Sequence, residues 1–285
     1  MPILSFQNIQ KSYGDFQALK NVDFSVEEGK FVALLGSNGA GKTTLINCLS
    51  GALEQTKGKI IVDGRNTLID SEYTKQNIGI VDQEITFDPF FSPIETLQMV
   101  QGFFGIQNTQ ENTQYLHWLL KKLSLDDKKD VASNTLSGGM KRRLMIAKAL
   151  VHKPKILILD EPTAGVDIEL RKNLWIFIKE LQKKYNTTIL LTTHYLEEAE
   201  AMADKTAILH NGEIIVYKDT KELMKNNNRK LCLTFQNKKV KNFVIEQDTD
   251  IMKNILEENS EKNQIINIQI KEPKLEEIFW EYTKK

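Results

Sequence analysis

The chain has 285 residues, more than one minimal domain needs and few enough for a core domain with a modest appendage. Hydrophobic residues make up 41% and charged residues 27%, a globular profile with enough apolar material for a core. Lys plus Arg and Asp plus Glu both number 38, so the net charge gives no indication of a nucleic-acid partner, and we expect none.

The two cysteines and the N-terminus exclude several other classes of protein. Cys48 lies in an apolar helical pattern and is expected to be a small buried thiol, while Cys232 lies far along the chain. Neither a disulfide framework nor a zinc site is indicated. Residues 1–16 lack the basic start and apolar segment of a signal peptide. No apolar run approaches the roughly 18–20 residues that a membrane span requires.

The first third of the chain predicts strands around a Gly-rich loop. Phe31–Leu35 is continuously apolar, as expected of a strand that is buried on both faces of a parallel sheet. A helix is expected after the loop, from about Lys42 to Leu49. The other strands expected here are Ile3–Ile9, Ala18–Val26, Lys59–Val62 and Ile78–Val81.

The middle of the chain predicts an inserted all-helical lobe followed by alternating elements. From about Pro93 to Val151, apolar residues recur at spacings of three and four. Beyond it the predicted elements are strand Ile156–Asp160, helix Glu169–Tyr185, strand Thr188–Thr193, helix Leu196–Met202 and strand Thr206–His210. This alternation is typical of an α/β fold with a mainly parallel sheet.

After Lys218 the pattern changes to that of a small α+β appendage. Residues 225–229 form a polar linker, so a domain of residues 1–220 and a second one of residues 226–285 are predicted. The strands expected in the appendage are Lys230–Phe235 and Ile265–Ile270, on either side of a helix over Asp250–Glu258. No internal repeat is visible.

The Gly-rich loop at residues 36–43 fits the pattern G-x-x-x-x-G-K-[ST]. Its glycines let successive N–H groups face a phosphate, and the following helix presents its positive end to the same anion. Lys42 supplies a mobile cation for the phosphates, and the Thr43 hydroxyl is a hard oxygen ligand for Mg²⁺. The nucleotide-binding residues predicted here are Gly36, Ser37, Asn38, Gly39, Ala40, Gly41, Lys42, Thr43 and Thr44.

Two adjacent carboxylates follow the apolar strand that ends at Asp160. Such a strand delivers them to the carboxyl edge of a parallel sheet, where ligands bind in these folds. Asp160 is placed to hold Mg²⁺ through water, and Glu161 is suited to polarise an attacking water as general base. Paired acids after a strand often only cap the next helix, but beside the phosphate loop the catalytic interpretation is favoured.

Residues 136–143, Leu-Ser-Gly-Gly-Met-Lys-Arg-Arg, resemble the LSGGQ signature sequence of ATP-binding-cassette (ABC) proteins. Ser137 can donate a hydroxyl, and Gly138 and Gly139 expose their backbone N–H groups ahead of a helix, which predicts a second anion site. The resemblance extends to four further positions in the family's order. Gln83 resembles the Q-loop glutamine that touches Mg²⁺, Asp167 belongs to a D-loop-like segment, His194 resembles the switch histidine, and Tyr13 the aromatic that stacks on adenine.

Taken alone, His194 would be a solvated or core histidine and Tyr13 a packing residue; the ordered set of motifs favours the functional interpretation. The resemblance covers residues 2–220 and departs from the family at three positions. Asp82 stands where proline commonly precedes the glutamine, Met140 replaces the signature glutamine, and Ser37 replaces a common proline. None of these changes removes a group that the chemistry needs.

The resemblance implies a P-loop NTPase of the ABC type. Its expected fold is a RecA-like parallel-sheet core with an antiparallel β subdomain and an inserted helical lobe. The expected activity is ATP hydrolysis, with ATP and Mg²⁺ as ligands. Two cassettes of this family face head to tail and bind ATP between the phosphate loop of one and the signature loop of the other. One cassette per chain therefore implies a homodimer.

Segments at residues 136–144, 160–167 and 194–200 resemble the multidrug and ABC-2-type export ATPases of bacteria, and so does Pro273–Phe279. That resemblance implies a separate ABC-2-type permease and a peripheral position on the cytoplasmic face of the cell membrane. The apolar loop at residues 87–91 is a candidate docking surface, with local packing as the alternative. The helix expected over Leu275–Tyr282 also fits simple packing. An importer ATPase and a soluble ABC ATPase remain as alternative functions.

Overall fold

The computed structural model describes residues 2–86, 88–163, 168–225, 229–245, 248–259, 264–271 and 273–284. The chain divides into two compact units, residues 1–217 and residues 218–285. This division lies a few residues before the predicted linker. Each unit has a core of its own and is described separately.

The first unit is built on a six-stranded sheet that includes the buried strand β3 (Phe31–Leu35). The strand order is β10-β9-β3-β8-β7-β6, and every pair from β9 to β6 is parallel. The prediction of an α/β fold with a mainly parallel sheet is confirmed. Besides β3, the strands are β6 (Ile78–Val81), β7 (Ile156–Asp160), β8 (Thr188–Thr193), β9 (Lys205–His210) and β10 (Glu213–Asp219).

Both faces of this sheet are buried, and alternate residues of each strand enter different cores. In β7, Leu157 and Leu159 pack with the helical lobe and with α6 (Ile168–Tyr185), whereas Ile156 and Ile158 pack on the other face. On that second face lies α1 (Lys42–Ser50). Since side chains alternate along a strand, a strand buried on both faces is expected to be continuously apolar, as β7 is from Ile156 to Leu159.

A second, antiparallel sheet with the order β2-β1-β4-β5 contributes to the same core as α1. Its strands are β1 (Pro2–Tyr13), β2 (Phe16–Glu27), β4 (Lys57–Val62) and β5 (Arg65–Asn66). The β1–β2 hairpin extends past the predicted ends because pairing continues to Tyr13 and Phe16, beyond the apolar residues that signalled the strands. The short helix α2 (Ser71–Asn77) leads from this sheet to β6.

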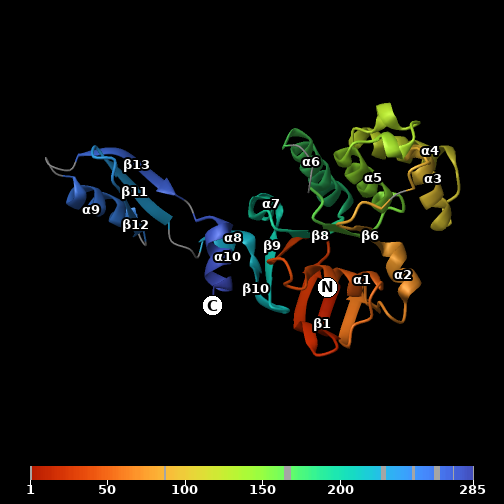
Figure 1. Ribbon diagram of the computed structural model, residues 1–285, viewed down its shortest axis with the longest axis horizontal. Helices are drawn as coiled ribbons and strands as arrows, with labels where there is room; N and C mark the ends of the chain where they lie inside the picture. The colour runs from red at the N-terminus through yellow and green to blue at the C-terminus, as the bar shows by residue number, and fades with distance from the viewer. Residues whose placement is uncertain are drawn as a thin grey trace. The chain divides into compact units, whose positions relative to one another are not determined.

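The helical lobe consists of α3 (Pro93–Phe103), α4 (Gln110–Lys122) and α5 (Gly138–Leu150), which lie together at one end of the first unit (Figure 1). The predicted span of residues 93–151 is not helical throughout. Gly105 and Ser124 adopt positive φ, which ends α3 and α4, and two 3-10 turns at Asp126–Lys128 and Ser133–Thr135 lead into α5. The last helix of this unit is α7 (Leu196–Met202).

The second unit holds a three-stranded antiparallel sheet in the order β12-β11-β13. Leu231, Leu233 and Phe235 of its central strand pack against Ile251 and Ile255 of α9. The sequence prediction missed β12, an edge strand whose polar residues obscure the alternation. The elements are α8 (Thr220–Lys225), β11 (Arg229–Phe235), β12 (Val240–Ile245), α9 (Asp248–Glu258), β13 (Ile265–Lys271) and α10 (Leu275–Thr283).

None of the helices in the described ranges is both long and apolar enough to span a membrane.

Candidate active site

The phosphate loop connects the carboxyl end of β3 to α1. Gly39 and Gly41 adopt φ of 81° and 109°, conformations that favour glycine. A Cβ at Gly41 would lie 2.8 Å from Leu19 Cδ2 and 2.9 Å from the carbonyl oxygen of Ala18, so only glycine fits against β2. Ser37, Asn38, Gly39 and Thr43 are exposed, and Thr44 is half-buried, while Gly36 and Ala40 are buried at the base of the loop.

Lys42 is 7% exposed, and its ammonium lies inside the loop. Its Nζ donates to the carbonyl oxygens of Gly36 at 2.8 Å and Ser37 at 3.2 Å. Burial lowers the pKa of Lys42, and the nearby carboxylates Glu161 and Asp160 oppose that shift. The loop therefore carries a desolvated cation whose partners are neutral carbonyl groups, an arrangement that favours a phosphate as counter-ion.

Asp160 and Glu161 lie at the carboxyl end of β7, as the sequence predicts, and are 3% and 9% exposed. The Thr192 hydroxyl on β8 donates to Asp160 Oδ1. Desolvation raises the pKa of Asp160, and the hydrogen bond from Thr192 opposes that shift. Glu161 adopts φ of 49°, a conformation that costs a residue with a Cβ about 1 kcal/mol. Its N–H donates to the Thr192 carbonyl at 3.0 Å, which secures this turn.

The Glu161 carboxylate lies between two of the other predicted catalytic residues. His194 Nδ1 lies 3.2 Å from Glu161 Oε1, and Gln83 Nε2 donates to Glu161 Oε2 at 3.4 Å. Gln83 follows β6 and His194 follows β8, the two neighbours of β7 in the sheet. Three side chains from three adjacent strand ends therefore meet here, with Gln83 and His194 on either side of the Glu161 carboxylate.

Arg142 on α5 is a contributor to the site that the sequence interpretation missed. Its guanidinium donates to the carbonyl oxygens of Asp82 and Gln83, both at 2.5 Å, and the residue is 3% exposed. Lys148, two turns further along α5, donates to the carbonyl oxygen of Thr86 at 3.3 Å. The loop that carries Gln83 is thus held by the helix that begins at the signature residues. No signal in the sequence pairs an arginine with carbonyl groups 60 residues earlier.

The signature residues begin α5. Ser137 is the N-cap, and its hydroxyl accepts from the N–H of Met140 at 3.3 Å. Ser137 and Gly138 are exposed and Gly139 is half-buried. Within one chain, the hydroxyl of Ser137 is used in capping its own helix, and these residues lie on the helical lobe while Lys42 lies on the sheet core (Figure 1).

Glu198 is a second residue whose role the sequence interpretation missed. Its carboxylate accepts from the Thr163 hydroxyl at 2.6 Å and from the Thr193 hydroxyl at 3.0 Å, and it is 6% exposed. Thr163 lies two residues after Glu161, and Thr193 directly precedes His194. One buried carboxylate therefore ties together the segments that carry these two site residues. The predicted D-loop residue Asp167 lies outside the described residues.

Tyr13 lies at the end of β1, away from the cluster of carboxylates. The side chain is 49% exposed, and Lys11 Nζ lies 5.2 Å from its ring centroid. The neighbouring strand β2 packs on the phosphate loop at Gly41. The structure places Tyr13 on the sheet that borders the loop, with about half of the residue exposed.

Comparisons with known proteins agree with this geometry. The ABC transporter family matches residues 19–164 of the chain, from β2 through the phosphate loop and the signature to the segment after Glu161. The chain belongs to the ABC transporter family of ATP-binding proteins. The Nod factor export ATP-binding protein I of Burkholderia orbicola (strain AU 1054) is 38% identical over 212 residues, which is 74% of this chain and 69% of that protein. The linearmycin resistance ATP-binding protein LnrL of Bacillus subtilis (strain 168) is 37% identical over 213 residues, 75% of this chain and 68% of that protein.

Solved ABC cassettes share this fold. An ATP-binding subunit of an ABC transporter superposes with a TM-score of 0.73 at 28% identity, over 79% of this chain and 92% of that one. A dimeric ATP-binding cassette in a post-hydrolysis state, bound to ADP and Pi, superposes with a TM-score of 0.69 at 27% identity, over 76% and 98% of the two chains. The resemblance to export-type ABC ATPases, inferred from the sequence motifs, is confirmed, and so is the P-loop ABC fold. The chain is an ATPase subunit of an ABC transporter.

The donor atoms of the site fit Mg²⁺, which this family of ATPases is expected to use with ATP. Within the described ranges, no three His, Cys, Asp or Glu side chains gather as a metal cage. Mg²⁺ does not need one, since it keeps several waters and binds one or two protein oxygens together with phosphates. Asp160 offers a buried carboxylate that has one hydroxyl partner in the described chain, and Thr43 and Gln83 offer neutral oxygens. A divalent cation would compensate the desolvated charge of Asp160.

Proposed function

We propose that this ATPase powers export through a separate membrane permease of the ABC-2 type, and that two copies of the chain close around ATP to do so. The names of the similar proteins support the direction, since they are a Nod factor export protein and a linearmycin resistance protein. These names favour export over the alternatives of an importer ATPase and a soluble ABC ATPase.

The main structural support for ATP hydrolysis at this site is the position of the Glu161 carboxylate between Gln83 and His194. We assign Glu161 as the general base that takes a proton from the attacking water at one of its Oε atoms. His194 orients this carboxylate through Nδ1 and presents its half-exposed ring to the γ-phosphate. Gln83 positions the water from the other side.

The nucleotide itself is assigned to the loop and to the strand-end groups. Backbone N–H groups of residues 36–44 and the Lys42 ammonium bind the phosphates. Thr43, Gln83 and Asp160 would hold Mg²⁺, which supplies charge neutralisation on the β- and γ-oxygens when bound. Tyr13 stacks on the adenine with its exposed ring face.

A second copy of the chain completes each nucleotide site in this proposal. Ser137, Gly138 and Gly139 begin α5 at the surface, where N–H groups and the positive end of the helix attract an anion. They lie on the lobe opposite Lys42, so they reach the γ-phosphate of a partner's nucleotide and not their own. Asp167 is assigned to the same interface by the family resemblance. The dimeric cassette bound to ADP and Pi supports this arrangement by analogy.

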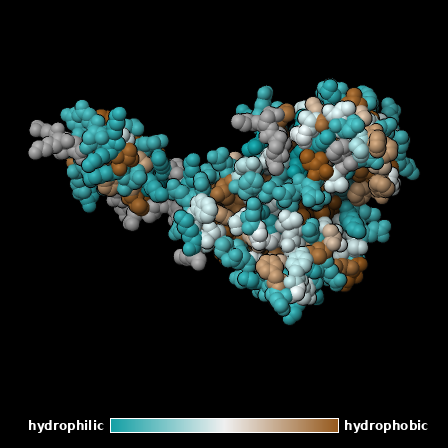
Figure 2. Space-filling model, viewed as in Figure 1, coloured by the Kyte–Doolittle hydropathy of each residue, from teal (hydrophilic) through white to brown (hydrophobic). Residues whose placement is uncertain are grey.

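The permease is proposed to dock in a groove of about 320 Å³ between the sheet core and the helical lobe. Leu49, Thr74 and Ile80 line it on one side, and Val100 and Phe104 on the other. Figure 2 shows hydrophobic residues at the surface over α3 and beside α2, on the two sides of this groove. Such an apolar surface is typical of a protein-binding site.

The loop of the predicted docking surface lies at the start of α3. Phe90 is 82% exposed, although the backbone of its loop is fixed by hydrogen bonds from Ser133 to Phe91 and from Asn134 to Pro89. Phe103, at the end of α3, is 79% exposed. Phe87 lies outside the described residues. An apolar side chain held outward by an ordered backbone favours docking over local packing.

The test is co-purification of the tagged chain from detergent-solubilised membranes. A membrane protein encoded beside it is expected to copurify with wild type, and ATP turnover is expected to rise with candidate cargo. Phe90→Ser should weaken the association at least tenfold and leave the ATPase of the isolated chain unchanged, while Ile176→Ser, at another exposed apolar residue, on α6, should change neither the association nor the ATPase. Recovery of the chain without any membrane protein, together with full ATP turnover, would favour the soluble alternative.

A further inference from the structure

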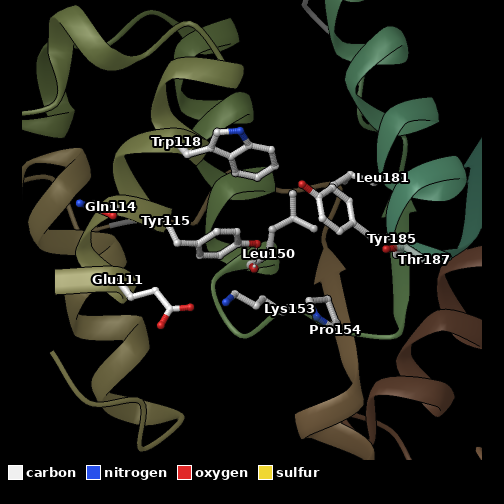
Figure 3. A pocket seen from close by; sticks show the side chains of 10 residues that line it. All are labelled: Glu111, Gln114, Tyr115, Trp118, Leu150, Lys153, Pro154, Leu181, Tyr185 and Thr187. Carbon is white, nitrogen blue, oxygen red and sulfur yellow. Dashed lines mark hydrogen bonds between the residues drawn. The ribbon is translucent and has the colours of Figure 1, made fainter. Parts of the chain in front are cut away.

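A cavity of about 570 Å³ opens in the first unit at the edge of the sheet opposite the catalytic carboxylates (Figure 3). Pro154 and Thr187 line it just before β7 and β8 begin, whereas Asp160 and His194 lie at or beyond the other ends of these strands. We call this cavity the amino-edge pocket. Its volume lies within the range of small-molecule sites in proteins. No part of the ATPase mechanism uses it.

The walls of the amino-edge pocket are aromatic and fixed by mutual packing. The Tyr115 hydroxyl donates to the Leu150 carbonyl at 2.9 Å, and the ring of Tyr115 stacks on Trp118 with centroids 5.5 Å apart. Trp118 in turn meets Tyr185 edge to face at 6.2 Å. In Figure 3 these three rings surround the opening, with Leu150 and Pro154 between them. The pocket is therefore preformed, and ring faces that a flat ligand could contact border it.

Two polar groups at this pocket lack a partner within the described chain. The Lys153 ammonium lies 4.7 Å from the centroid of Tyr115 and makes no hydrogen bond or ion pair there. The Tyr185 hydroxyl makes none either, and in Figure 3 its oxygen points toward Trp118. Lys153 also adopts φ of 52°, a conformation in which glycine would be less strained. The Lys153 ammonium at the rim and the Tyr185 hydroxyl at the wall can therefore donate hydrogen bonds to a ligand.

The charged groups around the rings indicate the sign of the charge that the ligand carries. A lysine ammonium lies over each of the three rings: Lys153 over Tyr115, Lys122 over Trp118 at 5.9 Å, and Lys184 over Tyr185 at 5.4 Å. A cationic ligand would have to displace these ammonium groups from the rings. An anion would gain from Lys153, the lysine that lines the pocket, whereas Lys122 is already paired with Glu180 at 2.6 Å. The one carboxylate that lines the pocket, Glu111, opposes anion binding from the rim.

We propose that the amino-edge pocket is a binding site for a planar aromatic anion of small-molecule size. The flat ring system lies among Tyr115, Trp118 and Tyr185, and the anionic group meets the Lys153 ammonium. The pocket walls come from α4 of the helical lobe on one side and from α6 and the approach to β8 on the other. A bound molecule would therefore bridge the lobe and the core.

The test uses two probes of nearly the same shape, anionic 8-anilinonaphthalene-1-sulfonate and neutral N-phenyl-1-naphthylamine. The full chain has three tryptophans, so Trp175→Phe with Trp280→Phe leaves Trp118 as the only tryptophan, and excitation at the red edge of tryptophan absorption avoids the tyrosines. We expect saturable energy transfer from Trp118 with one probe bound per chain. If the double variant folds poorly, isothermal titration calorimetry of the wild-type chain measures the affinity for the probe instead.

Two single variants then decide the role of charge. Lys153→Gly should weaken binding of the sulfonate about five- to tenfold, and Glu111→Gln should strengthen it two- to fivefold, since each change alters one charge at the rim. The neutral probe should be unaffected by either. Lys153→Gly relieves a left-handed conformation, so its thermal stability should not fall, which separates lost binding from lost folding. Lys284→Gly, which removes an ammonium 5.8 Å from Trp280, is the matched control.

Three results would overturn the proposal. One is transfer from Trp118 that does not saturate. Another is equal binding of the sulfonate to wild type and to the Lys153→Gly chain. The third is the reverse order of effects, with Glu111→Gln weakening the sulfonate, which would indicate a site for cations.

Discussion

The guanidinium of Arg142, at the second turn of the signature helix, donates to the main-chain oxygen of Gln83 at 2.5 Å. A second bond of 2.5 Å reaches the carbonyl of Asp82. A shift of α5 therefore moves the backbone of the residue that positions the amide beside Glu161. The signature region and the catalytic carboxylate are mechanically linked within one chain.

Replacing Arg142 with alanine should leave two carbonyl groups without their charged donor. We expect the free energy of unfolding to fall by about 2–3 kcal/mol and ATP turnover to fall at least tenfold, with little change in nucleotide affinity. Chemical denaturation and steady-state ATPase assays measure both effects. Arg142→Lys is the graded control, because a lysine can serve only one of the two carbonyls well; full activity in the alanine variant would exclude the linkage.

Glu198 joins Thr163 to Thr193, and its removal should loosen the segments on either side of the active site. Glu198→Ala leaves two buried hydroxyls without an acceptor, so we expect a loss of about 2–3 kcal/mol in unfolding free energy. ATP turnover should fall as well, because Glu161 and His194 lie close to the two threonines. Glu197→Ala, one residue earlier on the exposed side of α7, should change neither quantity. Equal stability of both variants would refute this role.

The surroundings of His152 predict that the free energy of unfolding depends on pH. Its ring stacks on Phe104 at 3.9 Å and its Nε2 lies 3.0 Å from the carbonyl oxygen of Ile78. Burial lowers the pKa of His152 below its ordinary value of 6.5, although the Ile78 carbonyl opposes the shift. The unfolded chain then binds a proton that the folded chain does not, so the unfolding free energy should fall as the pH falls below 6.5.

The measurement for His152 is denaturant unfolding between pH 5 and pH 8. His152→Gln should flatten the slope between pH 6.5 and pH 5 relative to wild type. His117→Gln, on the helical lobe, is the control and should leave the slope as it is. An unchanged slope in the His152 variant would show that its titration does not contribute.

Much of this structure follows from local patterns in the sequence. Strand β3, residues 156–159 of β7 and residues 189–191 of β8 are apolar runs that predict buried strands. The glycine spacing before Lys42 predicts a phosphate loop because few other sequences can form one. Asp160 and Glu161 could be placed at the ligand-binding edge of the sheet because they stand at the carboxyl end of a parallel strand. The roles of Arg142 and Glu198 could not be predicted, since the partners of Arg142 and one partner of Glu198, Thr163, are backbone carbonyls or a hydroxyl distant in sequence. An arginine or glutamate on a helix has the same local pattern whether it is buried or solvated.

The second unit shows another reason why an element can be missed in the sequence. Val240–Ile245 alternates apolar and polar residues poorly because it is an edge strand of a thin sheet, with Lys241 and Asn242 exposed. An exposed edge strand can contain many polar residues, so its sequence lacks the apolar pattern by which a strand is recognised. Strand β10 was missed as well, since Lys218 and Asp219 at its end resemble a loop.

The central claim is that ATP joins two copies of this chain, and the mass of the Glu161→Gln protein tests it most directly. That substitution removes the base but keeps the nucleotide groups, so saturating ATP with Mg²⁺ should convert the protein into a dimer in light scattering or sedimentation. The protein without nucleotide, and the same protein carrying Ser137→Arg, should stay monomeric. A single-chain mass under all of these conditions, both alone and with the membrane partner, would contradict the account.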